Sequence, residues 1–274
     1  MSYLGGKFNM IDDLMSQVCS IANITKPHTF MDCFGGGGSC SINARLCGYI
    51  FPNVTYNEKN PDVCSIMKVA KDKEAAYMMY RTLHQIEKTG GVSDALYEAA
   101  RLRLKFDDIT QQERVYQASI IAWCSFNSAW NGKSNARIKY FESYISRLLD
   151  VWMYLSHVDI MNRDAFELLD IYGKDPKVLK FLDPPYHPLC RNPHDKVYGE
   201  YDFIREDHKK LVQKLCDCTN WILCGYDPLA YKCEDYLPLE EAGAKKVLLG
   251  DYHLGSSASH GNPIKKAEYL WIKY

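Results

Sequence analysis

Residues 29–39 read TFMDCFGGGGS, and this stretch decides the fold class that the sequence predicts. The apolar segment from Thr29 to Cys33 has the composition of a buried strand, and four consecutive glycines follow it. Glycine has no Cβ, so the backbone can turn tightly there and approach a ligand, and a helix expected from about Cys40 presents free N–H groups. With a second strand at Val54–Tyr56, the start of the chain predicts one βαβ unit.

The pattern then becomes helical from Pro61 to about Met153, with no convincing strand. Strand-like segments return after it, at Val158–Met161, Val178–Leu182, Trp221–Gly225, Lys246–Leu249 and Glu268–Lys273. Helical patterns lie between several of these strands, which indicates an α/β domain. We therefore expect a ligand-binding α/β domain formed by residues 1–60 and 154–274, and a separate helical lobe at residues 61–153.

Composition limits the function classes. Of the 274 residues, 47% are hydrophobic and 24% are charged, which allows a substantial core. The net charge of -1 gives no global basic field, so a nucleic-acid partner would need a local patch. The eleven cysteines are scattered, and the closest pair, Cys216 and Cys218, lacks the spacing of zinc or redox pairs, so no metal is expected. No signal peptide or membrane span is visible, which predicts a cytoplasmic protein with reduced thiols and no membrane partner.

An acidic residue follows the second strand of the βαβ unit. Glu58 stands where a carboxylate can accept hydrogen bonds from both hydroxyls of a ribose. Together with the glycine loop, it predicts an adenosine-containing cofactor. A nicotinamide dinucleotide fits these two features equally well.

A second strand tip occurs at residues 181–188, which read FLDPPYHP. Pro184 and Pro185 cannot donate ladder hydrogen bonds, so they end the strand and hold Asp183 and Tyr186 at its tip. Taken alone, such a dipeptide most often marks a simple turn. Its order after a glycine loop and an acidic strand end favours a functional site.

Together, Phe34–Ser39 and Asp183–Tyr186 resemble the S-adenosylmethionine-binding and catalytic motifs of amino-group DNA methyltransferases. Other segments are similar to Dam-type (alpha group) N6-adenine methyltransferases. They are Tyr3–Lys7 as the N-terminal motif, Tyr56–Asn60 as the ribose-binding strand end, Asn162–Phe166 as the segment that holds the cofactor's adenine, and Phe203–His208 and Glu268–Tyr274 as later segments. The resemblance covers little of residues 61–150, and Gly35 and Gly37 stand at positions that vary in the family, so the loop is expected to be unusually flexible.

The resemblance implies a Rossmann-like methyltransferase domain with a mixed, mostly parallel sheet, and an inserted, mainly helical target-recognition lobe. It implies methyl transfer from S-adenosylmethionine to N6 of a flipped-out adenine at specific sites in double-stranded DNA, as in restriction–modification. The catalytic residues implied are Asp183, Pro184, Tyr186 and Lys7. The cofactor-binding residues implied are Tyr3, Lys7, Asp32, Phe34, Gly35, Gly36, Gly37, Gly38, Ser39, Glu58, Asp164, Phe166 and Asp183.

The residue types suit this chemistry. The amino lone pair of adenine is delocalised, and the Asp183 carboxylate and the Pro184 carbonyl can accept its two protons and direct the lone pair to the methyl group. Tyr186 offers a ring on which the extruded base can stack. Two assignments keep an alternative: Lys7 could be a solvated lysine at a helix start, and Asp164 could simply cap the helix that follows it.

DNA contacts are expected in residues 126–140, FNSAWNGKSNARIKY, because asparagine can pair with adenine and arginine with guanine. The candidates there are Asn127, Asn131, Lys133, Asn135, Arg137 and Lys139, and Ser256 and Ser257 could hold phosphates in a second loop. A polar surface loop explains the first stretch equally well.

Other functions stay open on the sequence alone. The same chemistry could act on N4 of cytosine or on adenine in RNA. A DNA-binding module with little activity is a further alternative, against which the complete motifs argue. A nicotinamide dehydrogenase leaves the motif at Asp183 unexplained. A C5-cytosine methyltransferase is disfavoured because no Pro-Cys pair is present.

Overall fold

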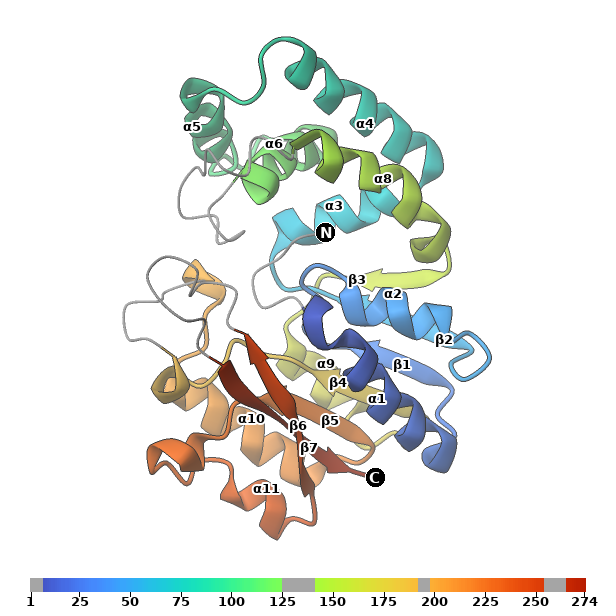
Figure 1. The fold of residues 1–274 in the computed structure, drawn as a ribbon, viewed down its shortest axis with the longest axis vertical. Helices are drawn as coiled ribbons and strands as arrows, with labels where there is room; N and C mark the ends of the chain where they lie inside the picture. Colours follow the sequence, from blue (N-terminus) through green and yellow to red (C-terminus); the bar gives the residue numbers. More distant parts are fainter. Residues whose placement is uncertain (1–6, 125–140, 192–197, 254–264) are drawn as a thin grey trace.

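The structure is a computed structural model that describes residues 7–124, 141–191, 198–253 and 265–274 (Figure 1). Within these ranges, seven strands form one sheet in the order β3-β2-β1-β4-β5-β7-β6. The strands are β1 (Thr29–Asp32), β2 (Asn53–Asn57), β3 (Val158–Met161), β4 (Val178–Leu182), β5 (Trp221–Gly225), β6 (Lys245–His253) and β7 (Lys265–Lys273). The first five strands in sequence are parallel, and β7 lies antiparallel between β5 and β6. The predicted α/β fold with a mixed, mostly parallel sheet is confirmed.

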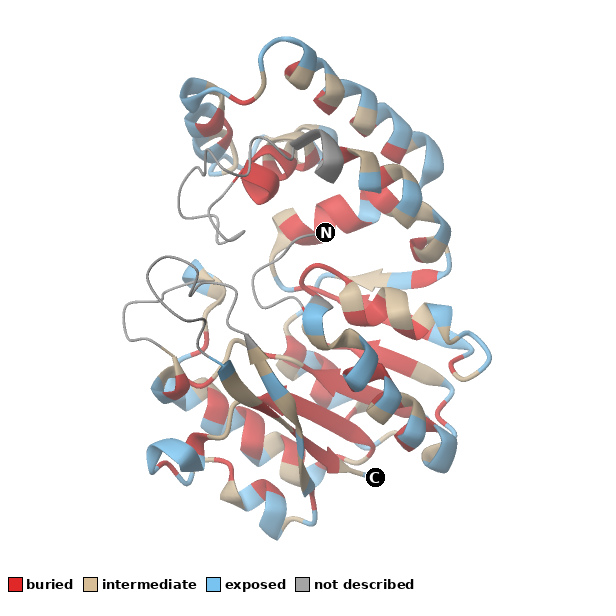
Figure 2. Ribbon diagram, viewed as in Figure 1, coloured by how far each residue is buried: buried red, intermediate tan, exposed pale blue. Residues whose placement is uncertain are grey.

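Helices cover both faces of the sheet. They are α1 (Ile11–Thr25) after the short η1 (Phe8–Met10), α2 (Ser39–Leu46), α9 (Ala165–Tyr172), α10 (Arg205–Asp217) and α11 (Leu237–Glu241), with single turns η3 (Pro188–Cys190), η4 (Gly199–Tyr201) and η5 (Pro228–Tyr231). Successive strand residues point to opposite faces, so Phe30 of β1 packs in the core under α1 while Met31 packs in the core under α9, α10 and α11. Figure 2 shows the central strands buried throughout, as expected for a sheet covered on both faces.

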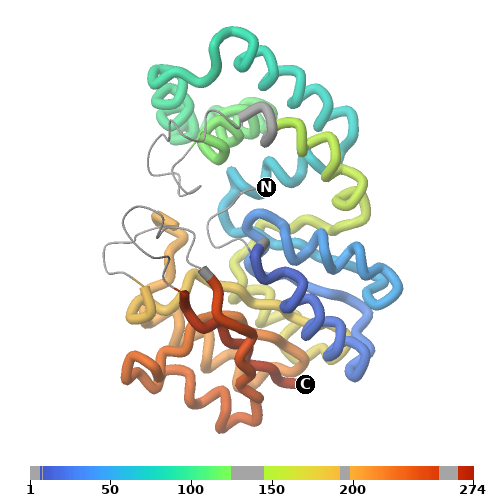
Figure 3. Tube along the Cα trace, in the orientation of Figure 1, coloured from blue at the N-terminus to red at the C-terminus, as the bar shows by residue number. Residues whose placement is uncertain are grey.

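The helical segment leaves the sheet after β2 and returns at β3, as the tube in Figure 3 shows. Its described helices are α3 (Pro61–Lys71), α4 (Lys73–Lys88), α5 (Asp94–Arg103), α6 (Gln111–Cys124) and α8 (Phe141–Leu155). They gather at one end of the molecule (Figure 1), yet one apolar core runs from Phe30 in β1 through Ile66 in α3 to Ile120 in α6. The helices therefore pack directly on the sheet domain.

Two details differ from the sequence expectation. The helical pattern predicted from Pro61 onward shows no break at Asp72, but this residue is extended and caps α4 by accepting a hydrogen bond from the Ala75 N–H at 2.7 Å. Strands β6 and β7 are also longer than expected, because their outer ends pair with each other beyond the reach of β5.

A buried lysine interrupts the apolar run of β4. The Lys180 side chain is fully buried, and its Nζ donates hydrogen bonds to the carbonyl oxygens of Tyr172, Gly173 and Asp175 at 3.2, 3.2 and 2.9 Å. These are carbonyls at and after the end of α9, which the helix itself cannot satisfy. Burial lowers the pKa of Lys180 to about 8.

None of the described helices is both long enough and apolar enough to cross a membrane.

Candidate active site

The two strand tips singled out in the sequence lie side by side. Strands β1 and β4 are parallel neighbours in which Asp32 stands opposite Phe181, and the Cys33 N–H donates to the Phe181 carbonyl at 2.9 Å. The chain runs from β1 to β2 on one side and from β4 to β5 on the other. In such open sheets, ligands bind at the carboxyl ends of the strands where the connections diverge, because the two following loops leave a crevice between them.

The glycine loop is tied to the end of β2. The Gly35 N–H donates to the Asn57 carbonyl at 2.7 Å, and the Tyr56 hydroxyl donates to the Gly36 carbonyl at 2.8 Å. A Cβ on Gly35 would lie 2.2 Å from Tyr56 Cε2, so this position requires glycine. Gly38 has a φ of 79° and is the N-cap of α2, so the first N–H groups of that helix follow directly after the loop.

The remaining loop positions follow from this geometry. Gly37 is buried within the loop, and Ser39 is the first residue of α2. Cys33 is buried, and burial raises the pKa of its thiol, which favours the neutral form over a nucleophilic thiolate.

Glu58 holds the loop through its carboxylate. Its Oε2 accepts a hydrogen bond from the Gly36 N–H at 2.9 Å, and its Oε1 accepts one from the Asn60 N–H at 2.8 Å. Burial raises the pKa of Glu58, while these N–H groups act to lower it. A carboxylate has about four acceptor sites, so Glu58 keeps acceptor capacity beyond its backbone donors, and a ribose hydroxyl would use it.

Asp32, at the end of β1, is buried beside the same loop. Its Oδ2 accepts a hydrogen bond from the Ser41 hydroxyl at 2.7 Å, whereas no described residue donates to its buried Oδ1. Burial raises the pKa of Asp32 to about 7, with smaller contributions in the same direction from Asp183 and Glu58. A buried carboxylate oxygen without a donor is costly, so a ligand donor would be accommodated there.

An aromatic cluster stands beside the loop. Phe166 stacks on Phe203 at a centroid distance of 5.8 Å, and Phe34 meets Phe203 edge to face at 5.5 Å. Phe203 was assigned no role from the sequence, because it follows no strand in the pattern of motifs. The ammonium of Lys210 lies 4.4 Å from the centre of the Phe166 ring. The cluster brings together Phe34, which follows β1, and the first turn of α9, which carries Phe166.

Asp164 fulfils the alternative role considered for it, at least in part. Its Oδ1 caps α9 by accepting the Phe166 N–H at 2.8 Å, and its Oδ2 pairs with Lys59 at 2.8 Å. Burial acts to raise the pKa of Asp164, but Lys59 and the Phe166 N–H outweigh it and lower the pKa. The carboxylate remains partly exposed next to the aromatic cluster, so capping does not exclude contact with a ligand.

The strand tip after β4 carries a buried charge cluster. Lys7 is 3% exposed, and its Nζ lies 2.6 Å from Asp183 Oδ1 and 3.8 Å from Glu268 Oε1. It also donates to the Tyr186 hydroxyl, which in turn donates to Glu268. Pro184, buried, holds the backbone between the two catalytic candidates. Lys7 is therefore buried in this cluster and is not a solvated lysine.

These contacts perturb the charges of the cluster. Burial raises the pKa of Asp183 to about 6; Lys7 acts to lower it and Glu268 to raise it. Burial opposes the charged form of Lys7, but the carboxylates of Asp183 and Glu268 outweigh this and raise its pKa well above the ordinary value. A carboxylate that titrates near neutrality inside a crevice is typical of acid–base sites.

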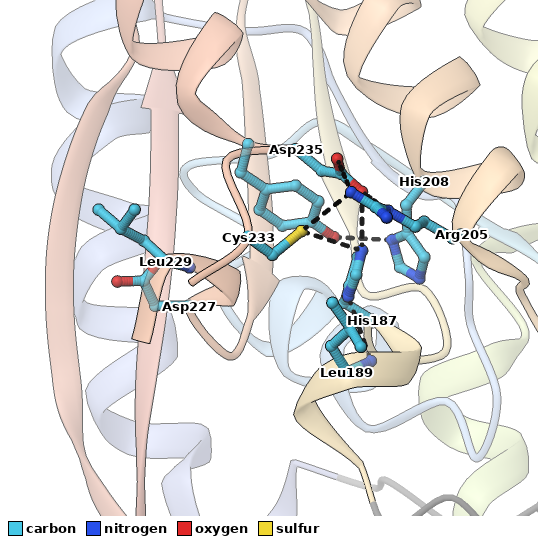
Figure 4. Close-up of polar contacts among 9 residues, drawn as sticks. His187, Leu189, Arg205, His208, Asp227, Leu229, Cys233 and Asp235 are labelled. Atoms are coloured by element: carbon cyan, nitrogen blue, oxygen red, sulfur yellow. Dashed lines mark hydrogen bonds and ion pairs between the residues drawn. The ribbon is translucent and has the colours of Figure 1, made fainter. Parts of the chain in front are cut away.

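A second polar network supports the segment after Tyr186 (Figure 4). The Leu189 N–H donates to His187 Nδ1 at 3.3 Å, so His187 carries its proton on Nε2, which lies 3.2 Å from Asp235 Oδ2. Arg205 binds both oxygens of Asp235 at 2.6 and 2.9 Å and holds the pKa of that carboxyl well below its usual range. His187 thereby ties the segment after β4 to the loop that carries Asp235.

The same network contains three potential metal ligands. Among the described residues, His187 Nε2, Cys233 Sγ and an Asp235 oxygen lie within 4.8 Å of one another. His187 Nε2, however, holds the proton that it gives to Asp235, and the guanidinium of Arg205 already neutralises the carboxylate. The protonated Nε2 has no lone pair to offer a cation, and the Arg205 guanidinium would repel the cation. The arrangement is therefore a hydrogen-bond network.

His208 belongs to the same support. It lies in α10, is fully buried, and its Nδ1 is 2.8 Å from the Tyr236 hydroxyl. Burial lowers the pKa of His208 to about 3, which keeps it neutral. This is the structural role expected from its place in the first turn of a helix.

Some predicted site residues lie outside the described residues. They are Tyr3, Asn127, Asn131, Lys133, Asn135, Arg137, Lys139, Ser256 and Ser257. Conversely, Glu268 lies in the centre of the charge cluster although the sequence assigned it no role. Glu268 begins a segment that resembles the family, but only its burial distinguishes it from other acidic residues on strands. The sequence does not reveal that burial.

Known proteins were compared with the whole chain. Residues 3–224 match the family model for D12 class N6 adenine-specific DNA methyltransferases. The chain is also 22% identical to the Type II methyltransferase M.MjaIII of Methanocaldococcus jannaschii, over an alignment covering 93% of this chain and 84% of that protein. The family match includes both the glycine loop and the strand tip at Asp183, and it selects the methyltransferase prediction over a dehydrogenase. This chain therefore belongs to the D12 class of N6 adenine-specific DNA methyltransferases, as its motifs predict.

Proposed function

We propose that this enzyme binds S-adenosylmethionine over the glycine loop and methylates N6 of an adenine turned out of double-stranded DNA at a specific site. The observation that carries the proposal is the position of Asp183. Its carboxylate stands at the tip of β4, directly beside the loop that follows β1, and only 16% of the side chain is exposed. A base entering this crevice would meet the carboxylate and the cofactor together.

The cofactor site is supported by the shape and the chemistry of the crevice. The close packing of Gly35 against Tyr56 fixes the glycine loop against the end of β2. Glu58 would accept hydrogen bonds from the ribose, and the free oxygen of Asp32 would accept one from the amino group of the methionine moiety. Asp164 would accept one from the adenine amino group, and Phe166 would pack on the adenine ring.

The reaction needs acceptors for the amino protons of the target. S-adenosylmethionine supplies an electrophilic methyl group on a positively charged sulfonium. Asp183 and the Pro184 carbonyl would accept the two N6 protons and aim the nitrogen lone pair at that methyl group. As positive charge develops on N6, the Asp183 carboxylate stabilises it and receives a proton. Tyr186 would stack on the base and offset part of its unstacking, which costs a few kcal/mol.

Target recognition is assigned to the inserted helices, residues 61–153. This segment lies between the acid of the cofactor site and the strand tip at Asp183 in the sequence, and it packs on the sheet domain through α3. The net charge of -1 gives no overall attraction to DNA, so binding would depend on a local patch. The asparagine-rich stretch at residues 126–140 would contact the bases.

Replacement of Asp183 tests the proposal. Asp183→Ala removes a proton acceptor but none of the loop, so we expect S-adenosylmethionine binding to persist and methyl transfer to fall at least about a thousandfold. Tritium transfer to DNA measures the rate, and calorimetry measures cofactor binding. The matched control is Asp170→Asn, which removes an exposed carboxylate paired with Lys214. An Asp183→Ala enzyme with undiminished turnover would contradict the assigned role.

The wild-type products test the wider claim. The protein is incubated with S-adenosylmethionine and genomic DNA, and the modified bases are mapped. N6-methyladenine at one recurring sequence is the expected result. If the product is N4-methylcytosine, or if only RNA is methylated, adenine in DNA is not the target. If no base is methylated above background, the chain is better described as a DNA-binding module with little activity.

A further inference from the structure

Glu268 is a buried carboxylate at the centre of the strand-tip cluster. It lies on β7, is 1% exposed, and stands beyond residue 224, where the family match ends. Its Oε1 accepts hydrogen bonds from the Tyr186 hydroxyl and, at 3.2 Å, from the Cys224 thiol, and it lies 3.8 Å from Lys7 Nζ. A carboxylate is rarely buried this completely unless it is paired, and here the pairing partners are two catalytic candidates.

We propose that Glu268 is a positioning residue for methyl transfer. It shares the Lys7 ammonium with Asp183 and anchors the Tyr186 hydroxyl, so that the Asp183 carboxylate stays available to the target amino group. This inference rests on the function proposed above for the same site.

The charge of the cluster explains why a second carboxylate is needed. Lys7 and Asp183 alone would form a neutral pair, with the whole charge of the Lys7 ammonium, 2.6 Å from Asp183 Oδ1, opposing the negative charge of that carboxylate. With Glu268, one ammonium is shared by two carboxylates, and the cluster carries one net negative charge. Asp183 receives the N6 proton as the new carbon–nitrogen bond forms and the carbon–sulfur bond breaks. The surplus negative charge lies beside N6 while that atom is cationic.

The anchoring of Tyr186 gives Glu268 a second effect. The Tyr186 ring meets Tyr226 edge to face at 4.4 Å on one side, and its hydroxyl is held by Lys7 and Glu268 at the other end. A ring fixed at both ends loses little conformational freedom when a base stacks on it, so capture of the extruded base becomes more favourable.

The titration of Asp183 depends on all the groups that face it. Burial raises its pKa to about 6, Lys7 lowers it, and Glu268 raises it. The other titratable groups that interact with this cluster are Asp32 at the end of β1, Cys40 on α2, Tyr186, Tyr198, Cys224 and Tyr226 at and after the end of β5, and Tyr252 on β6. Removal of the Glu268 charge leaves Lys7 to Asp183 alone, so the pKa of Asp183 should fall.

The first measurement is made on the free protein, without cofactor or DNA. Aspartate is labelled with carbon-13 at Cγ, and Asp183 is assigned by the signal missing in Asp183→Asn. In the wild type this signal should titrate near pH 6, and in Glu268→Gln its midpoint should move down by roughly half a unit or more. An unchanged midpoint in a folded Glu268→Gln protein would overturn the proposal, and it would do so without reference to activity.

The second measurement is the pH dependence of kcat/KM for methyl transfer. Asp183 must be ionised to accept a proton, so activity falls as the pH drops through its pKa, and the acid limb should move to lower pH in Glu268→Gln. The rate at neutral pH should fall roughly tenfold or more. Glu241→Gln is the matched control: it removes an exposed carboxylate at the end of α11 and should change neither quantity.

Glu268→Asp keeps the charge but draws it away from Lys7 and Tyr186. It should shift the Asp183 midpoint in the same direction by a smaller amount, and this variant decides the question if Glu268→Gln does not fold. A midpoint that stays at the wild-type value would refute the positioning role. If the wild-type enzyme methylates adenine and the Glu268 variants behave like it, only the positioning role fails and the proposed function stands. If the wild-type enzyme methylates no adenine, the proposed function itself fails.

Discussion

The contact between Gly35 and Tyr56 makes a sharp prediction about the glycine loop. In Gly35→Ala, the new Cβ would lie 2.2 Å from Cε2 and 2.4 Å from Cδ2 of the Tyr56 ring. Carbon atoms in contact stay about 3.5 Å or more apart, so the loop and the ring must separate by roughly 1 Å or more. Neither moves freely, because Tyr56 is fully buried and its hydroxyl is bonded to the Gly36 carbonyl.

The expected cost follows from this overlap. Overpacking of a well-packed core costs about 1–3 kcal/mol, so the free energy of unfolding of Gly35→Ala should fall by about that amount in urea titrations. The displaced loop also carries the Gly36 N–H that binds Glu58 at 2.9 Å, so the affinity for S-adenosylmethionine measured by calorimetry should fall at least tenfold.

A double-mutant cycle supplies the control. Tyr56→Leu removes the ring atoms that the new methyl group would meet, so Gly35→Ala should cost much less in the Tyr56→Leu background than in the wild type. If the cost is the same in both backgrounds, or if Gly35→Ala leaves stability and cofactor affinity unchanged, steric contact with Tyr56 is not the reason for glycine at this position.

Two further predictions concern the strand β4 and its tip. Tyr186→Ala should weaken capture of the extruded base, because the stacking ring is lost. The rise in fluorescence of 2-aminopurine placed at the target position measures this capture. A rise equal to that of the wild type would count against stacking. Lys180→Met removes the ammonium donor that the carbonyls of Tyr172, Gly173 and Asp175 share, although each keeps one backbone N–H donor. We expect the free energy of unfolding to fall by about 0.5–1.5 kcal/mol in urea titrations. The exposed Lys177→Met is its control, and equal stability of the two variants would show that the buried ammonium stabilises nothing.

Local sequence predicted the central strands closely. The expected bounds of β3, β4 and β5 coincide with those in the structure, because each strand is a short apolar run ended by polar residues, proline or glycine. The bounds of β6 and β7 were missed at their outer ends, where the strands pair only with each other and carry polar side chains. The helix break at Asp72 was also missed, since helical periodicity continues across it while the capping bond is a single side-chain contact.

The active site divides in the same way. The glycine loop and the motif at Asp183 are each short, and their chemistry is visible in consecutive residues, so the sequence by itself determined the family, the fold class and the two strand tips that matter. Only the tertiary structure decided their partners. Tyr186 and Glu268 are 82 residues apart and meet because β7 inserts antiparallel beside β5, and Phe203 joins Phe166 and Phe34 from a separate segment. Strand order depends on how the whole sheet assembles, and no local pattern of apolar and polar residues encodes it.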